Sequence, residues 1–502
     1  TAHALRITTT KVMVVWLGWA AALLILQVLH LAFPLNGFVA APVFLLGIAF
    51  AMPRLRGLRV APAPAIVLVL AAIWIASRSM VAPQMYDAGL YHLNAIRWMH
   101  TFPIVPGLGN LHGRLAFNQS YFTYAASLNL APLFENGYRA ANGFLVLLGG
   151  ATFLTRLRSL PSLFALPILG HLALLSPGLT SPTPDVATEV LQLVMFVMLA
   201  DLLWTEERAP GETGMLVLLA ATAITIKLSN LAFAVVVLAI ALALARQMRV
   251  IVLAMVMLLV WMTRGYVSSG VPLYPSTLGH IAFDWAVPRA DVAEMAALIR
   301  GWAGEPNQNW RVAVENGTWI HGWIERICQE KVEVLYPLVL GVCFLCAALR
   351  KPRRETLLLL PVLVGLVFWF VTAPDPRFAH ALFSCFAIAA ALLFLTTVQP
   401  RLSRRNFLVV LCSVFALTHL GITLQAIRHR HAIAEISLTG WQPIPVVPLI
   451  RRTTASGLTV LTPTTDDRCW DAPLPCTPYF RVDLRLRVPG RMERGFAVTP
   501  VN

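Results

Sequence analysis

Long apolar runs recur along nearly the whole sequence, and they constrain the fold more than any other feature. The hydrocarbon core of a bilayer is about 30 Å thick and is crossed by roughly 20 apolar residues in a helix, because backbone amides in lipid must be hydrogen-bonded within their own segment. Hydrophobic residues make up 58% of the 502 residues and charged residues only 13%, and the mean hydropathy is +0.71. The sequence therefore predicts an all-α polytopic membrane protein rather than a set of soluble domains.

We predict about thirteen membrane-spanning helices within residues 1–426, followed by a tail, 427–502. The run 12–33 is too long for a removed signal peptide and lacks a small-residue cleavage site. The break at Lys227–Asn230 fits either a hairpin tip or an interruption in one long helix. The predicted spans are 12–33, 37–52, 62–79, 138–155, 161–177, 185–204, 214–228, 231–245, 250–264, 333–349, 355–373, 378–397 and 406–426.

The positive charges predict the orientation of these spans. The chain has 39 Lys and Arg against 24 Asp and Glu, a formal charge of +15, and the cations cluster on alternate short loops, such as 54–59, 350–354 and 401–405. Cytoplasmic loops of membrane proteins carry this excess, whereas the opposite short loops offer only Lys227 and Arg377. We therefore expect a cytoplasmic N-terminus and an outer C-terminus. The same distribution argues against nucleic acid as a partner.

Three segments are too polar to span, and this topology places all of them outside: about 80–137, about 265–332, and the tail. Tryptophans of the second segment are typical membrane-interface anchors and could also line a lipid or sugar groove. Cys469 and Cys476 bracket a turn-rich stretch of the tail, which lies in an oxidising compartment, so we predict a disulfide between them. Residues 480–488 alternate apolar and polar side chains, which predicts a strand.

The first outer segment combines an acid, histidines, asparagines and aromatic residues with Pro and Gly at turn positions, a mixture that suits a shaped pocket. Its candidate site residues are Asp87, His92, His112 and Arg114. The alternative is an interfacial helix through Leu90, Leu93 and Ile96, with Asp87 as its N-terminal cap.

Other charged residues lie at the outer ends of spans, each with a simpler reading. Asp185 could cap a helix, Lys227 could extend to the interface, and Arg377 could pair with neighbouring Asp375. The predicted topology nevertheless brings Asp87, Asp185, Lys227 and Arg377 to one face, with Arg264 as a further candidate. A carboxylate can accept the proton of an acceptor hydroxyl, while Lys and Arg neutralise a leaving phosphate.

The sequence lacks a Walker A loop, a dinucleotide-binding loop and a zinc-binding helix motif, and its histidines have no metal-ligand spacing. We therefore expect no cofactor and no metal site.

Residues 86–92 (YDAGLYH) and 104–112 (IVPGLGNLH) resemble a subgroup of GT-C-like polytopic glycosyltransferases of bacterial membranes. The likeness also covers 272–275 (PLYP), 227–229 (KLS), 374–377 (PDPR) and the tail from Cys469 to Cys476. It implies a helical bundle in the inner membrane, with a catalytic acid in the first outer loop, which acts on polyprenyl-phosphate-linked sugars at the periplasmic face. Asp87 matches that acid.

The family motif often has a second acid two residues from the first, but Gly89 stands there in this chain. The departure favours a metal-independent transfer from a polyprenyl monophosphate donor. By position and chemistry, Lys227 and Arg377 would hold the phosphate. The acceptor would be a glycan, lipid or protein of the cell envelope.

Two other functions fit parts of the sequence. An O-antigen polymerase or ligase acting on lipid-linked oligosaccharides would use arginines and histidines such as His92, Arg97, His112 and Arg114. A transporter or lipid flippase would use buried charges as substrate or proton sites. The odd number of spans, the lack of repeats and the location of polar residues on one face argue against the transporter.

Overall fold

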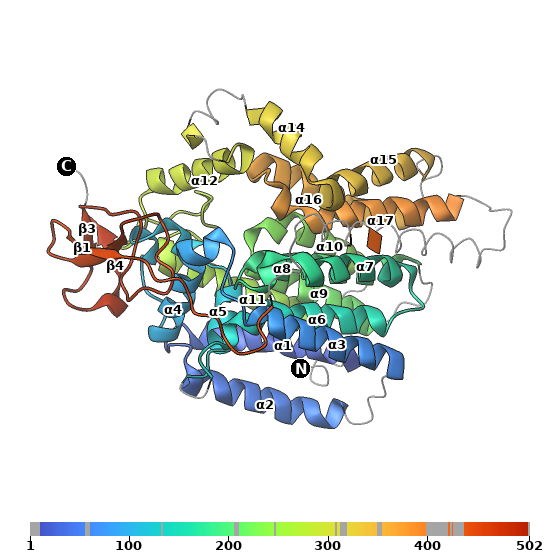
Figure 1. The fold of residues 1–502 in the computed structure, drawn as a ribbon, viewed down its shortest axis with the longest axis horizontal. Helices are drawn as coiled ribbons and strands as arrows, with labels where there is room; N and C mark the ends of the chain where they lie inside the picture. The colour runs from blue at the N-terminus through green and yellow to red at the C-terminus, as the bar shows by residue number, and fades with distance from the viewer. Residues whose placement is uncertain are drawn as a thin grey trace.

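The computed structural model describes residues 11–55, 61–131, 134–204, 210–244, 247–306, 309–311, 319–348, 354–397, 420–421, 424 and 436–499. This part of the chain is mostly helical. Figure 1 shows the long helices running side by side along the molecule, with the strands of the tail gathered at one end. The helices are α1 (Lys11–Leu29), α2 (Gly37–Leu55), α3 (Pro62–Ser79), α4 (Leu93–Thr101), α5 (Tyr121–Ser127), α6 (Ala141–Leu154), α7 (Leu160–Leu175), α8 (Pro184–Trp204), α9 (Pro210–Ile226), α10 (Leu231–Leu244), α11 (Met248–Ser269), α12 (Arg289–Gly304), α14 (Trp319–Gln329), α15 (Tyr336–Ala348), α16 (Leu359–Thr372) and α17 (His380–Thr397).

Local sequence sets several of the helix ends. Ser159 precedes α7, and its hydroxyl accepts a hydrogen bond from the Ser162 N–H, which satisfies one of the free donors of the first turn. Pro161 lies in that same turn, where proline removes no helical hydrogen bond. At the other end of a helix, α11 stops at Gly270, whose φ of 77° is a left-handed conformation that glycine adopts readily.

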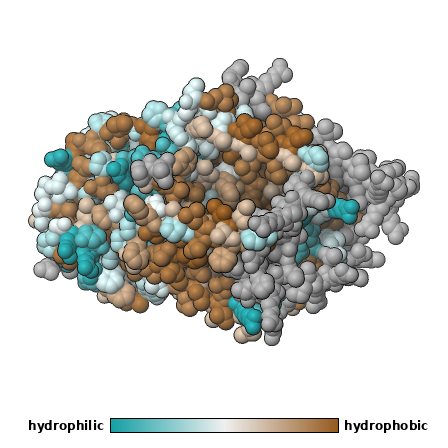
Figure 2. Space-filling view, turned by 90° about the horizontal axis from the view of Figure 1, so that it is seen from below, coloured by the Kyte–Doolittle hydropathy of each residue, from teal (hydrophilic) through white to brown (hydrophobic). Residues whose placement is uncertain are grey.

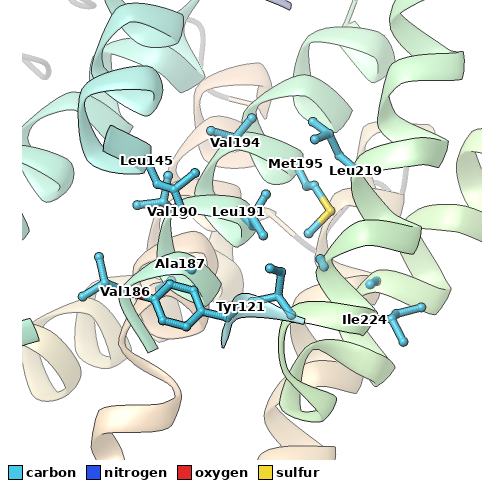
Figure 3. Close-up of a cluster of buried hydrophobic side chains, with 14 of the residues drawn as sticks. Tyr121, Leu145, Val186, Ala187, Val190, Leu191, Val194, Met195, Leu219 and Ile224 are labelled. Carbon is cyan, nitrogen blue, oxygen red and sulfur yellow. The ribbon is translucent and has the colours of Figure 1, made fainter. Parts of the chain in front are cut away.

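α8 is the central helix of the bundle, and 89% of the residues in its apolar stretch are buried inside the protein. It packs against α6, α7, α9 and α17. Figure 3 shows its side chains, including Val190, Leu191 and Met195, meeting Leu145 of α6, Tyr121 of α5, and Leu219 and Ile224 of α9. A helix that is apolar on all sides requires apolar neighbours around its whole circumference. The first turn of α8 is therefore held firmly in place.

The outer helices expose apolar side chains. On α2, Phe38, Leu45 and Phe50 are 84%, 65% and 67% exposed, and the face seen in Figure 2 has a broad hydrophobic middle with hydrophilic residues toward one end. Among the described residues, five helices are long and apolar enough to cross a membrane: Val12–Leu29, Pro62–Ser79, Pro184–Trp204, Met248–Ser269 and Arg354–Thr372, the last beginning in the turn before α16. An apolar belt of this extent on a protein surface is typical of a lipid-facing bundle.

Helices occupy each predicted span from 12–33 to 378–397, while the predicted span 406–426 falls almost wholly outside the described residues. The break at Lys227–Asn230 is a hairpin tip, because α9 and α10 pack against each other on either side of it. It contains the 3-10 turn Leu228–Asn230.

In residues 436–499, the part of the tail that the structure describes, there are two small antiparallel sheets and one disulfide. β1 (Leu449–Thr453) pairs with β2 (Thr459–Pro463), and β3 (Leu484–Leu486) pairs with β4 (Phe496–Val498). The predicted strand over 480–488 was too long, since only its middle pairs with a partner. Cys469 is bonded to Cys476, as predicted. Figure 1 shows α4, α5, α12 and these strands together at one end of the bundle.

Candidate functional site

Asp87 lies immediately before the π-helical turn Ala88–His92, which leads into α4, and is only 9% exposed. Its side chain makes no capping hydrogen bond to that turn. Instead, Arg377 Nη2 donates to Asp87 Oδ2 at 3.0 Å, and Arg114 Nη1 lies 3.6 Å from Oδ1. Asp87 thus stands at the N-terminal end of this turn without a side-chain capping bond, and its carboxylate is bound by two cations that are distant in sequence.

Arg377 belongs to the short 3-10 turn Pro376–Phe378 between α16 and α17. Asp375 caps this turn by accepting a hydrogen bond from the Arg377 backbone N–H at 3.0 Å, whereas Arg377 Nε is 3.9 Å from Asp375 Oδ1. The guanidinium carbon Cζ lies 5.0 Å from the centre of the Trp302 ring. Asp375 thus positions the backbone of Arg377, and the guanidinium makes its closest ion pair with Asp87.

Asp185 and Lys227 form a second ion pair beside the first. Asp185 lies within the first turn of α8, and its N–H donates to Thr183 Oγ1 at 3.3 Å, so Asp185 is not the cap. Lys227 has an extended backbone at the hairpin tip, and its Nζ lies 3.9 Å from the centre of the Phe378 ring. The same ring lies 4.6 Å from Arg377 Cζ. Phe378 therefore contacts both cations and links the two ion pairs.

The charges of the two pairs act on one another. Burial alone would raise the pKa of Asp87, but Arg377 and Arg114 outweigh it and hold that pKa below its ordinary value of 3.8. Burial alone would lower the pKa of Arg377, yet Asp87 and Asp185 raise it above its ordinary value. At neutral pH both groups are charged. Arg377 also has Asp375 Oδ1 at 3.9 Å from its Nε, so a third carboxylate lies beside the two pairs.

Two predicted histidines lie close by and are neutral at pH 7. Burial lowers the pKa of His92 to about 4, against the opposing effect of Asp87, and its Nδ1 has no hydrogen-bond partner among the described residues. Burial lowers the pKa of His112 to about 3, and Arg114 adds to that effect. The His112 ring contacts Tyr479 of the tail, with ring centres 5.2 Å apart.

The tail covers the Asp87 segment. The backbone N–H of Trp470 donates to the Gly89 carbonyl at 2.8 Å. A side-chain carbon placed on Gly89 would lie 2.8 Å from two atoms of the Trp470 indole. Tyr86 also donates a hydrogen bond to Asp467. Gly89 is therefore required for the close approach of the tail.

Arg264 is not part of this group, which corrects its assignment as a phosphate ligand beside Lys227 and Arg377. It lies on α11, where its Nη1 donates to His30 Nδ1 at 2.9 Å and to the Gln27 carbonyl at 3.4 Å. Two charged residues at a similar depth in the membrane can lie on different sides of a bundle. Sequence spacing does not show on which side each of them lies.

Sequence reasoning missed a second set of ionisable side chains close to the first. Glu189 lies one turn after Asp185 on α8, and its Oε1 is 3.8 Å from His380 Nδ1. His171 Nε2 donates a hydrogen bond to Glu333 Oε1 at 3.1 Å. Intramembrane acids are costly and usually functional, so Glu189 inside the predicted span 185–204 was the signal that could have found this set.

The arrangement offers a buried carboxylate beside cations that can bind phosphate oxygens. Within the described ranges, no three His, Cys, Asp or Glu side chains are grouped so that they could hold a metal ion. The immediate contacts of Asp87 are cationic, which disfavours a divalent ion there.

Comparisons with known proteins identify a family and no characterised relative. No curated protein matches the chain, and no solved structure matches it. A family model described as "Domain of unknown function (DUF8201)" matches residues 2–384, which is most of the chain. The chain therefore belongs to the DUF8201 family.

Proposed function

We propose that this chain is a GT-C-type membrane glycosyltransferase that transfers a sugar from a polyprenyl-phosphate donor to an acceptor of the cell envelope. The observation that carries the proposal is the buried Asp87 carboxylate, held between Arg377 and Arg114, with the Lys227–Asp185 pair beside it. A general base next to fixed cations is what displacement of a phosphate leaving group requires.

In the proposed reaction, Asp87 accepts the proton of an acceptor hydroxyl while that oxygen bonds to the anomeric carbon of the sugar. The bond between the anomeric carbon and the donor phosphate oxygen breaks, and its electron pair leaves with the phosphate. Lys227 and Arg377 stabilise the charge that develops there. Direct attack from the opposite side inverts the configuration at the anomeric carbon.

Without substrate, the same cations are occupied by carboxylates. A donor phosphate must therefore compete with Asp87 for Arg377 and with Asp185 for Lys227. Once Arg377 binds the phosphate, the main interaction that lowers the pKa of Asp87 weakens, and the carboxylate becomes a stronger base. Donor binding would in this way activate the base only when a leaving group is present.

Neighbouring groups support a monophosphate donor. Gly89 occupies the place of the second acid in the common motif of GT-C glycosyltransferases. No metal-ligand cluster lies among the described residues. The aromatic faces of Trp302 and Phe378, which lie against Arg377, suit contact with a sugar ring or an isoprenoid chain.

We further propose an inner-membrane location with about thirteen spans, a cytoplasmic N-terminus and a periplasmic site. At the opposite end of the bundle, Arg156 pairs with Asp201 at 2.9 Å and with Glu212 at 2.7 Å. It still counts toward the orientation, because the orientation follows Lys and Arg rather than net charge. Cysteine labelling of introduced thiols from each side of oriented vesicles tests it.

The decisive experiment supplies the purified protein in liposomes with a radiolabelled polyprenyl monophosphate sugar and a cell-envelope extract as acceptor. Wild type should transfer label, and Asp87→Asn should lose on the order of 10²- to 10⁴-fold in rate, the usual contribution of a general base. Asp284→Asn is the matched control, since Asp284 is a half-exposed acid paired with Arg487 on the surface. It should transfer at the wild-type rate.

Two results would count against this assignment. Equal rates for Asp87→Asn and wild type would remove Asp87 as the base. Consumption of a lipid diphosphate oligosaccharide instead of the monophosphate sugar would indicate a polymerase or ligase.

A further inference from the structure

A second polar site lies apart from the Asp87 group, around a cavity of about 30 Å³ near the outer end of α11. It is lined by His30, Trp98, Asn118, Arg264, Ser268 and apolar residues of the first outer segment. A cavity of roughly 10–15 Å³ holds one water molecule. The space therefore accepts about two waters, or two of the oxygens of a larger anionic group.

Arg264 lines this cavity and is only 2% exposed. No carboxylate lies within ion-pair distance of it in the described part of the chain. A buried charge is costly unless a partner compensates it, and within a membrane span such a charge usually marks a functional site. Its neighbours, His30 Nδ1 and one carbonyl at 3.4 Å, leave most of its five donors unused.

None of the residues that line the cavity is an acid. Arg264 Nε and the Trp98 indole N–H are both buried and without a hydrogen-bond partner. His30 Nε2 lies 3.2 Å from the Phe102 carbonyl, an arrangement that makes Nε2–H the donor and leaves Nδ1 to accept from Arg264. Native proteins rarely leave buried donors unsatisfied, so two at one cavity call for an acceptor that the chain does not supply.

Arg139 is a matched arginine away from this cavity. It is also 2% exposed, and its Nε is likewise buried without a partner, but its Nη1 donates to the carbonyls of Gln442 at 2.9 Å and Met80 at 3.4 Å, and its guanidinium lies over the Trp441 ring at 5.4 Å. It holds the start of the tail and is not among the residues that line the cavity.

We propose that Arg264 and Trp98, with His30 holding the Arg264 guanidinium in place, form an anion-binding site for a phosphate group, from either free phosphate or a lipid headgroup. Arginine suits this role because its planar fork matches phosphate oxygens. The site is distinct from the Asp87 group, because Asp87, Lys227 and Arg377 are not among the residues that line it. The proposal does not depend on glycosyltransferase activity.

The test measures binding of inorganic phosphate to the purified full chain by calorimetry in detergent. An Arg377→Gln background removes one of the two proposed phosphate ligands of the other site. In that background, Arg264→Met should weaken phosphate binding at least tenfold, and Trp98→Phe, which deletes one N–H donor and keeps an aromatic ring, should weaken it about threefold. Arg139→Met is the control and should leave the affinity unchanged.

A second arm distinguishes the source of the phosphate. The same proteins are placed in nanodiscs of phosphatidylcholine with or without phosphatidic acid, and the melting temperature is recorded, because a ligand that binds only the folded state raises it. If phosphatidic acid raises the melting temperature of wild type but not of Trp98→Phe, the ligand is a lipid headgroup. If inorganic phosphate binds in the calorimeter but phosphatidic acid does not raise the melting temperature, the ligand is free phosphate. If neither ligand distinguishes wild type from Trp98→Phe and from folded Arg264→Met, the site does not exist. Should Arg264→Met not fold, Trp98→Phe decides alone.

Discussion

The ion pair between Asp87 and Arg377 gives the most direct test of the site, because its strength can be worked from the geometry. The charged atoms are 3.0 Å apart, and the side chains are 12% and 28% exposed. At an effective dielectric constant of about 20, two unit charges at this distance attract by about 5 kcal/mol. Desolvation of both groups and the second cation, Arg114, offset much of that attraction. We expect a net coupling of about 2 kcal/mol.

The measurement is a double-mutant cycle of wild type, Asp87→Asn, Arg377→Gln and the double variant. Each is unfolded in detergent micelles and followed by tryptophan fluorescence, and the coupling is the non-additive part of the free energies of unfolding. The control cycle uses Arg311 and Glu294, whose paired side chains are 61% and 50% exposed. Exposed pairs of this kind are typically worth about 0.2–1 kcal/mol.

The pH dependence of the cycle follows from the direction of the Asp87 pKa. Arg377 and Arg114 lower that pKa in the folded protein below 3.8, so the carboxylate contributes stability that is fully present above about pH 4. The contribution is lost as pH falls through the folded-state pKa. The coupling should therefore be constant from about pH 5 to 8 and decline only in stronger acid. A coupling at pH 7 no larger than that of the control cycle would refute the pairing.

Other substitutions test the surroundings of this pair. Gly89→Ala places a carbon 2.8 Å from the Trp470 indole, so it should cost about 1–3 kcal/mol and expose the tail to protease; unchanged digestion would contradict the close contact. Lys227→Met leaves Asp185 buried and unpaired, and should lower the free energy of unfolding by about 3–5 kcal/mol; adding Asp185→Leu should restore most of the loss, and an additive double variant would contradict direct pairing. Reduction of the tail disulfide should likewise speed tail digestion, while leaving the transmembrane helices resistant.

Several local features could be predicted from the sequence because their causes are local. Apolar runs such as 184–204 form helices, since hydrogen bonds within one segment satisfy their backbone. The Cys469–Cys476 disulfide follows from a short turn-rich loop. The hairpin at Lys227 was one of two readings, and only packing of α9 on α10 decided between them.

The partners of the charged residues could not be predicted in the same way. Asp375 is two residues from Arg377 and was the simpler candidate for its partner, yet Asp87, 290 positions away, is closer to the guanidinium. Arg264 has the same chemistry as Arg377 and an outer position on its helix, but it belongs to a separate cavity. Which partner such a side chain meets depends on how its helix is rotated about its axis and on which helix lies next to it. Both depend on packing over the whole bundle.

The sequence by itself determined that the chain is a helical, membrane-compatible protein whose apolar runs are interrupted by polar segments near 80–137 and 265–332 and followed by a polar tail. It could do so because hydropathy and turn chemistry act over tens of residues. Only the tertiary structure decided which charges meet. It placed Asp87, Arg114 and Arg377 together, separated Arg264 from them, and laid the tail over Gly89. The physical reason is that a buried charge is stabilised by whichever opposite charge or donor the packed helices bring within a few ångströms, however far away that group lies in the chain.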